Sequence, residues 1–431
     1  MNRKFLISRY PAYKDSGIEW IGEIPKYWEV KRINDIAVQQ KIKNAGLIEK
    51  NLLSLSYGKI KRKDFESNFG LLPESFETYQ ITENGNIILR LTDLQNDKKS
   101  LRVGLVKERG IITSAYLCLH LFKYIDPVFA YYLFFTYDIC KVFYWFGGGL
   151  RQSMKFDDIK VLPFIIPPLN EQKAIANYLD NKTAQIDRQI DLLTEKAKLY
   201  NNLKHSLINE TVTRGLDKTV PMKDSGIEWL GEIPEHWEEK RLKDIAILER
   251  GKFTHRPRND PQMYDGVHPF IQTGDVARSV KYVTNYKQTL SDKGITVSKC
   301  FPKGTLVMAI SANIGDVAIV NFNTYFPDSI VAYKSKKCIT DYLFYLFLAT
   351  RSELDKVKVT STQDNLNVER LNSLIRFIPP LPEQKNIADY LDTKTSQIDK
   401  IIETINTQIE KLKELRKTLI NDVVTGKIKV V

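Results

Sequence analysis

A tandem duplication constrains this chain more than any other feature of its sequence. The segment KDSGIEWIGEIPKYWEVKRINDIA at 14–37, here called the marker, returns as KDSGIEWLGEIPEHWEEKRLKDIA at 223–246. A second motif, IIPPLNEQKAIANYLDNKTAQID at 165–187, returns as FIPPLPEQKNIADYLDTKTSQID at 377–399. Long-range self-similarity of this kind means that one structural unit is built more than once. We therefore expect two like units in a pseudo-two-fold relation.

The second motif opens a predicted long helix in each copy. A proline pair disfavours helix just before it, and Glu171 or Glu383 lies in the first turn, where a negative charge suits the helix dipole. Residues then recur at alternating steps of four and three, which is the spacing of a coiled-coil seam. Lys204 and Arg416 share one seam position, where a polar residue can fix the register. Two helices of roughly 60 Å each would pack on each other, although two amphipathic helices could also pair without any special function. The seam residues are Ile186, Ile190, Leu193, Ala197, Tyr200, Lys204, Leu207 and Thr211 in the first copy, and Ile398, Ile402, Ile405, Ile409, Leu412, Arg416, Leu419 and Val423 in the second.

The segment between marker and helix is typical of a globular domain in both copies. Apolar runs at 86–89, 304–310 and 316–320 are bounded by Gly, Asn and Asp, as strands joined by turns are. We predict an α+β fold, with two domains of mixed, twisted β-sheets separated by two long antiparallel coiled-coil helices in a pseudo-two-fold tandem repeat. The predicted parts are 1–27 (N-terminal part of the repeated region), 28–164 (first globular domain), 165–214 (first spacer helix), 215–236 (linker and second marker), 237–377 (second globular domain) and 378–431 (second spacer helix and C-terminal tail).

The remaining composition favours a reducing, aqueous compartment. The four cysteines are scattered without a CxxC pair, which argues against zinc, and the N-terminal apolar run is too short for a signal peptide. The apolar stretch 128–146 suggests a membrane span, but it contains Asp138 and Lys141, and its counterpart at 341–357 carries more charges. We expect a buried helix in both copies, no membrane contact and a cytoplasmic protein.

The net charge of +12 is concentrated in the globular segments. Segment 28–164 holds 20 Lys and Arg against 15 Asp and Glu, and segment 237–377 holds 21 against 15. Helical segment 165–213 balances 6 against 6, and 378–425 holds 7 against 8. Basic globular units on a neutral scaffold suggest a polyanionic partner such as nucleic acid, although an excess of this size is also ordinary for a protein surface.

The richest polar cluster lies in the second domain, in ERGKFTHRPRNDP at 249–261 and PFIQTGDVARSVKY at 269–282. Arginine can bond guanine edges or phosphates, lysine can hold phosphates, and glutamine can pair with adenine in the major groove. In the first domain we take SLSYGKIKRK at 54–63 and RLTDLQ at 90–95 as the counterparts. The polar residues near 151 and 363 could contact DNA or merely cap the last elements. The predicted DNA-binding residues are Tyr57, Lys59, Lys61, Arg62, Arg90, Gln95, Arg151, Lys252, Thr254, His255, Arg256, Arg258, Gln272, Thr273, Arg278, Lys281 and Gln363.

No catalytic signature accompanies this cluster. No GxGxxG follows a strand, and the tetrapeptide of amino-methyltransferases (Asn or Asp, two prolines, an aromatic) is absent. An acidic-x-Lys spacing at 156–160, as in nucleases, is lost in its counterpart at 368–372, so packing or capping explains it better. The five histidines show no metal-ligand spacing. We predict no catalytic residue, no metal and no cofactor in this chain.

These features together resemble one protein family. Two variable basic domains, each ending in PPL-x-EQ and a long helix, look like the specificity subunit of type I restriction–modification systems, and so do the repeated SGIEWIGEIP and SGIEWLGEIP markers. The tripeptide Thr254-His255-Arg256 and the run FIQTGD at 270–275 resemble a pattern of that family's target-recognition domains, from which the first domain departs. The resemblance covers nearly the whole chain.

The resemblance implies a DNA-reading scaffold that carries no catalysis. Segments 28–164 and 237–377 would be target-recognition domains, each reading one half of a bipartite target in the major groove of double-stranded DNA. The implied partners are modification subunits, expected to number two, which bind S-adenosylmethionine, and restriction subunits, which use ATP and Mg²⁺. Two other classes remain open, namely a nuclease with an unrecognised site and a non-catalytic coiled-coil adaptor that binds DNA without sequence preference.

Overall fold

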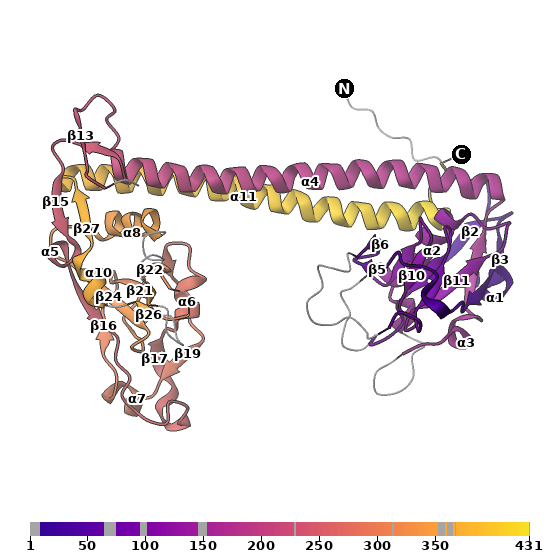
Figure 1. Ribbon diagram of the computed structural model, residues 1–431, viewed down its shortest axis with the longest axis horizontal. Helices are drawn as coiled ribbons and strands as arrows, with labels where there is room; N and C mark the ends of the chain where they lie inside the picture. Colours follow the sequence, from indigo (N-terminus) through magenta and orange to yellow (C-terminus); the bar gives the residue numbers. More distant parts are fainter. Residues whose placement is uncertain are drawn as a thin grey trace. The chain divides into compact units, whose positions relative to one another are not determined.

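The computed structural model divides into two compact units, of which unit 1 is assembled from two separate stretches of the chain and unit 2 from a single one (Figure 1). Unit 1 comprises Met1–Thr194 and Thr407–Val431, and unit 2 comprises Glu195–Asn406. Each unit holds one globular domain, here called head 1 (29–166) and head 2 (238–378), with parts of both long helices. The units thus cut across the predicted helical parts. The described residues are 9–63, 75–94, 101–144, 153–227, 230–312, 314–351, 358–359, 365–366 and 368–430.

The long helices α4 (Leu169–Arg214) and α11 (Leu381–Val424) pair in an antiparallel sense within each unit. In unit 2 the ammonium of Lys204 donates to both carboxylate oxygens of Asp399 at 2.7 Å. In unit 1 Nε of Arg416 lies 3.0 Å from Oδ1 of Asp187, without the alignment of a hydrogen bond. The two basic seam residues therefore pair with aspartates at equivalent positions of the opposite helix. The predicted coiled-coil helices are confirmed.

Each long helix ends on a glycine that the backbone requires. Gly215 follows α4 with φ 72°, and Gly426 follows α11 with φ 78°. This left-handed conformation ends many helices, because it lets the chain turn away while backbone N–H groups still reach the last carbonyls. The amide of Gly215 donates to the carbonyl of Thr211 at 3.1 Å, and that of Gly426 to Val423 at 3.2 Å.

Head 1 is built on an antiparallel sheet in the order β4-β11-β8-β9, whose buried face packs on α2 (Pro127–Ile139). Asp126 caps α2 by accepting from the amides of Val128 and Phe129 at 3.0 Å. A second, smaller layer holds the pair β7–β10 and the hairpin β5–β6. The other elements are β1 (Tyr13–Asp15), β2 (Glu23–Pro25), β3 (Glu29–Arg32), α1 (Ile33–Ile36), β4 (Ala37–Gln40), η1 (Ala45–Leu47), β5 (Leu53–Ser56), β6 (Lys59–Arg62), β7 (Gln80–Thr82), β8 (Ile87–Leu89), β9 (Val103–Leu105), β10 (Gly110–Ile112), β11 (Leu117–Leu121), η2 (Val142–Tyr144), α3 (Phe156–Ile159) and β12 (Pro163–Ile166).

Head 2 is built on a mixed sheet in the order β16-β24-β21-β22-β18, in which β18 runs parallel to β22. Helix α8 (Thr340–Ala349) packs on it, and a second sheet has the order β19-β17-β23-β20. The other elements are β13 (Met222–Asp224), β14 (Glu232–Pro234), β15 (Glu238–Arg241), α5 (Leu242–Ile245), β16 (Ala246–Arg250), η3 (Pro261–Met263), β17 (Tyr264–Phe270), α6 (Thr273–Ala277), β18 (Tyr282–Val283), β19 (Gln288–Leu290), α7 (Asp292–Thr296), β20 (Cys300–Phe301), β21 (Leu306–Ala309), β22 (Val317–Val320), β23 (Thr324–Tyr325), β24 (Ile330–Ser335), β25 (Lys358–Val359), β26 (Asn365–Leu366), α10 (Val368–Ser373) and β27 (Ile375–Ile378).

The two heads share one topology despite their different sequences. Strands β4, β11, β8 and β9 correspond in order and pairing to β16, β24, β21 and β22, and the pair β7–β10 corresponds to β20–β23. The apolar runs at 86–89, 304–310 and 316–320 form β8, β21 and β22, as predicted. Helices α2 and α8 are buried in their heads, and no helix in the described part of the chain is long and apolar enough to cross a bilayer. The predicted α+β fold is confirmed.

Candidate nucleic-acid interface

The repeated motifs fasten each marker to its long helix through one glutamate, which is buried in unit 1 and half-buried in unit 2. In unit 1 the carboxylate of Glu171, at the start of α4, accepts from the indole Nε1 of Trp28 at 3.2 Å and from the Tyr27 hydroxyl at 3.0 Å. The Tyr10 hydroxyl donates to the same carboxylate. Burial, with the hydrogen bond to Glu171, raises the pKa of Tyr10 above its ordinary value, so this hydroxyl stays a donor. The joint ties the marker to the first turn of the helix.

Unit 2 repeats this joint with different neighbours. Glu383 of α11 accepts from the indole of Trp237 at 3.2 Å, and its other oxygen lies 2.9 Å from Nε2 of His236. The end of the other helix closes the joint, because a Cβ at Gly215 would lie 2.9 Å from the Glu383 carboxylate. The end of α11 packs against the first marker in the same way, through Gly426.

A glutamine beside each glutamate fixes the head's own helix. Oε1 of Gln172 accepts from the amide of Asp126, at the start of α2, at 2.8 Å. Oε1 of Gln384 accepts from the amide of Ile339, at the start of α8, also at 2.8 Å. The Glu-Gln pair of PPL-x-EQ therefore orients the head on the spacer, and it leaves neither residue available for DNA.

A second attachment lies further along each spacer helix. The Tyr132 hydroxyl of α2 donates to Asp180 of α4 at 2.6 Å, and the Tyr345 hydroxyl of α8 donates to Asp392 of α11 at 2.6 Å. In head 2 the ammonium of Lys281 also bonds Asp392, at 2.5 and 2.7 Å. Each head is thus held at two points on its helix.

Lys281 was predicted to hold a DNA phosphate, but the structure uses it as an internal strut. Its side chain is only 11% exposed, and its Nζ also lies 2.6 Å from Oδ1 of Asp341. Lys59 in head 1 occupies a similar place, 3.5 Å from Asp187 of α4. Because an ammonium held by two carboxylates is poorly placed for a third anion, we leave Lys281 out of the proposed interface.

The predicted arginines of head 2 are exposed but already have partners. Nη2 of Arg258 donates to both oxygens of Asp328, at 2.8 and 3.1 Å. Arg256 folds back on the carbonyls of Phe253 and His255, at 3.1 and 2.7 Å. His255 in turn lies 2.9 Å from Asp260. These bonds hold the loop 251–260 in a defined conformation.

The second half of the predicted cluster surrounds the short helix α6. Gln272 precedes the helix and donates to Gln288 at 2.9 Å, while Arg278 at its end pairs with Asp275. Thr254 makes only a long bond, at 3.4 Å, to the carbonyl of Val297. The side chains of Lys252 and Thr273 make no hydrogen bond or ion pair within the described part of the chain.

In head 1 the predicted residues gather on the hairpin β5–β6. Tyr57 occupies its turn with φ 48° and is 83% exposed, and Lys61 is exposed as well. Nε of Arg62 donates to Glu108 at 2.7 Å. Arg90 lies half-buried after β8. The predictions for Gln95, Arg151 and Gln363 lie outside the described residues.

A buried arginine that sequence reasoning missed shapes the loop after β8. The guanidinium of Arg102 is fully buried and donates to the carbonyls of Arg90 and Thr92, at 3.1 and 2.8 Å. Its own amide donates to Asp138 of α2 at 2.6 Å. An isolated arginine in a variable segment carries no sequence signal that separates this role from a surface one.

The topology also corrects the expected matches between the heads. The loop that begins at Arg90 follows β8 and therefore corresponds to the one that begins at Ile310 after β21, not to 269–282. The counterpart of the cluster 251–261, which follows β16, is the segment after β4, not the hairpin 54–63. Sequence comparison missed these matches because the heads share strand order rather than residues.

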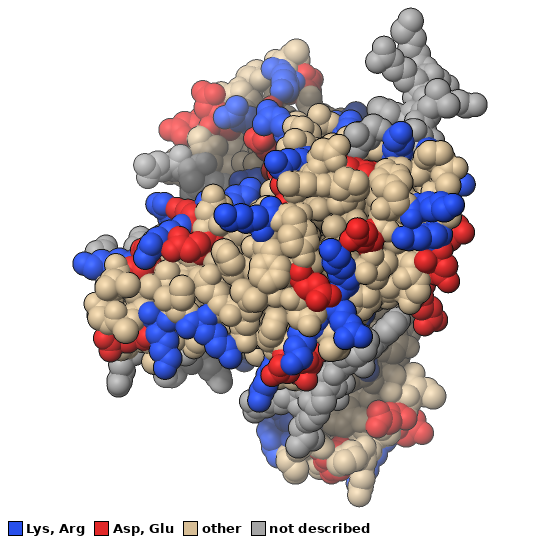
Figure 2. Space-filling model, turned by 90° about the vertical axis from the view of Figure 1, so that its right-hand side faces the viewer, with Lys and Arg blue, Asp and Glu red and all other residues tan. Residues whose placement is uncertain are grey.

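Charge alone does not outline the interface. On the face drawn in Figure 2, Lys and Arg are interspersed with Asp and Glu. Among the described residues, no group of three or more His, Cys, Asp or Glu is placed to hold a metal ion. Exposed donors on defined loops are therefore a better guide than net charge.

Comparison with known protein families finds one family that matches both copies of the repeat. The family described as "Type I restriction modification DNA specificity domain" matches residues 25–198 and again residues 234–411. The chain belongs to this family. The two matches coincide with the two copies of the repeat, so each specificity domain consists of a head and the first part of its helix.

Two relatives of known name match large parts of the chain. The chain is 26% identical to the type I restriction enzyme MjaVIII specificity subunit of Methanocaldococcus jannaschii, over 94% of each chain. It is 22% identical to the type I restriction enzyme EcoKI specificity subunit of Escherichia coli, over 65% of this chain and 61% of that one. Both relatives are specificity subunits, as the resemblance of the motifs predicted.

Two solved structures share the fold. One chain, from work described as the structural basis of complex assembly and conformational transition of the type I R-M system, superposes with TM-score 0.73 at 16% identity, covering 93% of this chain and 98% of that one. The HsdS subunit from Thermoanaerobacter tengcongensis superposes with TM-score 0.53 at 15% identity, covering 94% and 98%. At these identities the likeness concerns the fold, and the contacts of the specificity domains with DNA have to be argued from this chain's own residues.

Proposed function

We propose that this chain is the specificity subunit of a type I restriction–modification complex and that each head reads one half of a bipartite DNA target. The observation that carries the proposal is the family match of both repeats, joined to two heads of one topology that are each clamped at two points on a long helix. Rigid attachment suits a reader, because recognition needs side chains held in a defined geometry.

The chain's own residues supply binding and no chemistry. The exposed arginines, held in place by carboxylates and carbonyls, can exchange those partners for guanine edges, and the lysines can hold phosphates. Methylation and cleavage would belong to partners, namely two modification subunits that bind S-adenosylmethionine and restriction subunits that use ATP and Mg²⁺. This role places the chain in the cytoplasm, with its DNA and its partner subunits.

A single-domain exchange tests the proposal. Segment 28–164 is replaced by the equivalent domain of a related specificity subunit, and the methylated sites are mapped in cells that carry the parental or the exchanged chain. One half of the target should change while the half read by 237–377 stays the same. The reciprocal exchange of 237–377 is the matched control. A swap that changes both halves, or neither, would contradict the modular function.

Two further measurements separate the other classes. The purified chain incubated with DNA and Mg²⁺ should leave the DNA intact, whereas cutting without partners would indicate a nuclease. Binding to cognate and scrambled duplexes at moderate salt should differ, whereas equal binding would indicate an adaptor without sequence preference.

A further inference from the structure

The strand order of the heads identifies a loop that corresponds to the cluster 251–260. In head 2 this cluster leaves β16, crosses to the second layer and forms an isolated bridge between Phe253 and Ser298, next to β20. In head 1 the chain leaves β4 and forms the bridge between Lys43 and Gln80 of β7. Because β4 corresponds to β16 and β7 to β20, the segment 41–50, here called the 41–50 loop, takes the same place in head 1.

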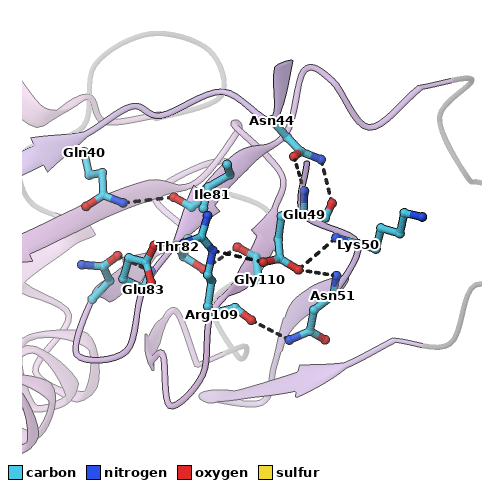
Figure 3. A network of polar contacts seen from close by, with 11 residues as sticks. Gln40, Asn44, Glu49, Lys50, Asn51, Ile81, Thr82, Glu83, Arg109 and Gly110 are labelled. Carbon is cyan, nitrogen blue, oxygen red and sulfur yellow. Dashed lines mark hydrogen bonds and ion pairs between the residues drawn. The ribbon is translucent and has the colours of Figure 1, made fainter. Parts of the chain in front are cut away.

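The 41–50 loop is closed by one buried side chain (Figure 3). Nδ2 of Asn44 donates to the carbonyl of Glu49 at 2.9 Å, and Oδ1 accepts from the Glu49 amide at 2.9 Å. The side chain thus imitates a backbone pair and joins the two ends of the loop. Between them Gly46 and Leu47 have φ of 72° and 51°, so the chain reverses tightly.

The acidic group of the loop is turned inward. One oxygen of Glu49 accepts from the amides of Lys50 and Asn51 at 2.9 Å, and the other accepts from Nε of Arg109 at 3.1 Å. The amide of Asn51, followed by that of Lys50 and by the Arg109 guanidinium, holds the pKa of Glu49 below its ordinary value. The loop therefore keeps its only carboxylate in internal bonds, and the same bonds stiffen it.

The side chains of the 41–50 loop that face solvent are of the kinds that contact DNA. Lys41, Lys43 and Lys50 are exposed, and within the described part of the chain their ammonium groups make no hydrogen bond or ion pair. Ile42 is 52% and Ile48 69% exposed. Ammonium groups bind phosphates, and apolar side chains on a reading loop can contact the methyl group of thymine in the major groove.

We propose that the 41–50 loop is a DNA-contacting surface of head 1, with its lysines on the phosphate backbone and Ile48 against a base edge. The inference rests on the proposed function and extends it to residues that composition and motif do not mark. A surface side chain as exposed as Ile48, held on a loop braced by Asn44, suits a contact that needs a fixed position rather than a flexible one.

The test uses the full chain and a library of randomised DNA duplexes, from which bound duplexes are selected and sequenced. Ile48→Asp should change the enriched motif in one half only, and Arg258→Ala, in the corresponding loop of head 2, should weaken selection of the other half only. Lys43→Ala/Lys50→Ala should weaken binding to all duplexes and lower the slope of log affinity against log salt by about 1 for each phosphate that is no longer bound. The paired variant with arginine at both positions should restore the slope.

Matched controls keep the outcomes distinct. Lys196→Ala/Lys198→Ala, on an exposed face of α4, removes the same charge and should leave the motif unchanged. Unfolding midpoints show that each variant is folded. If the parental chain enriches no bipartite motif, the proposed function fails. If it enriches one and the Ile48 and Lys43/Lys50 variants bind the same motif with the same salt slope, the 41–50 loop is not the contact.

Discussion

Lys281→Met isolates the strut between head 2 and the spacer helix. Methionine keeps most of the length and apolar body of lysine, so it can still pack against the rings of Tyr282 and Tyr345, which lie 5.3 Å from the ammonium. What it removes is the ammonium that joins Asp341 of α8 to Asp392 of α11. The variant therefore reports on the ion pairs rather than on packing.

The magnitude follows from burial and distance. The three contacts of 2.5 to 2.7 Å are short, charge-assisted bonds, each of a kind that contributes about 1.5–3 kcal/mol. The carboxylates of Asp341 and Asp392 are 37% and 41% exposed, so water can replace much of what they lose. We expect a net loss of about 2 kcal/mol, which in a unit of this size lowers the unfolding midpoint by roughly 4–8 °C.

The assay is differential scanning calorimetry of the full chain. Lys59→Met is the matched control in head 1, because Lys59 is 63% exposed and 3.5 Å from Asp187, and such a pair contributes at most about 1 kcal/mol. Only the transition of unit 2 should move in the Lys281 variant. Equal shifts of the unfolding midpoint in the two variants, or no shift in either, would refute the stabilising role of the Lys281 ion pairs.

The pH dependence gives an independent check. Burial opposes the charge of Lys281, but its hydrogen bonds to Asp341 and Asp392 outweigh burial and raise its pKa. A raised pKa in the folded state means that the stabilisation is complete below the unfolded pKa, about 10.4, and is lost as pH rises through the folded pKa. The stability gap between parent and variant should stay constant from about pH 6 to 9 and narrow above roughly pH 10.

Three further experiments test the joints and the seam. Glu171→Gln should lower the free energy of unfolding of unit 1 by about 2 kcal/mol, because the single amide oxygen of glutamine cannot accept from all three donors of the joint. An unchanged unfolding midpoint would show that the joint does not depend on the carboxylate. Gly426→Ala should lower the free energy of unfolding more than Gly215→Ala does. A Cβ at position 426 would lie 2.4 Å from a proline ring atom of the marker, whereas a Cβ at position 215 would meet a flexible carboxylate. Equal losses of unfolding free energy in chemical denaturation would contradict this. A double-mutant cycle of Lys204→Ala and Asp399→Ala should show a coupling of about 0.5–1 kcal/mol, and zero coupling would remove the pair from the seam.

The repeat and the helices could be predicted from residues close together in the sequence. Heptad spacing is local, so it was enough to place Ile398 and Ile405 in the seam, where both side chains are buried. The duplication also argued against membrane spans in two apolar stretches. Corresponding stretches should have the same role in both copies, and the charged residues in them do not suit a membrane span. The roles of Glu171 and Glu383 in the joints could not be predicted from the sequence, because their indole donors lie 143 and 146 residues away along the chain.

The contact residues show the limit most clearly. Sequence type made Lys281, Arg256 and Arg258 equal candidates for DNA, but a lysine bonded to an aspartate 111 positions along the chain differs from one that faces solvent. The 41–50 loop was overlooked for the converse reason, because three scattered lysines and two isoleucines carry no motif.

Local periodicity and internal repetition, which depend only on the order of nearby residues and on copying, by themselves determined the two-unit design and the antiparallel helices. The resemblance of the repeated motifs to a known pattern indicated the family. The tertiary structure alone decided which charged side chains are held inside and which strands correspond between heads. The physical reason is that burial and pairing arise between residues far apart in the chain. Two sheets with the same strand order can be built from different residues, so only the folded chain showed that the 41–50 loop and the 251–260 cluster occupy one place.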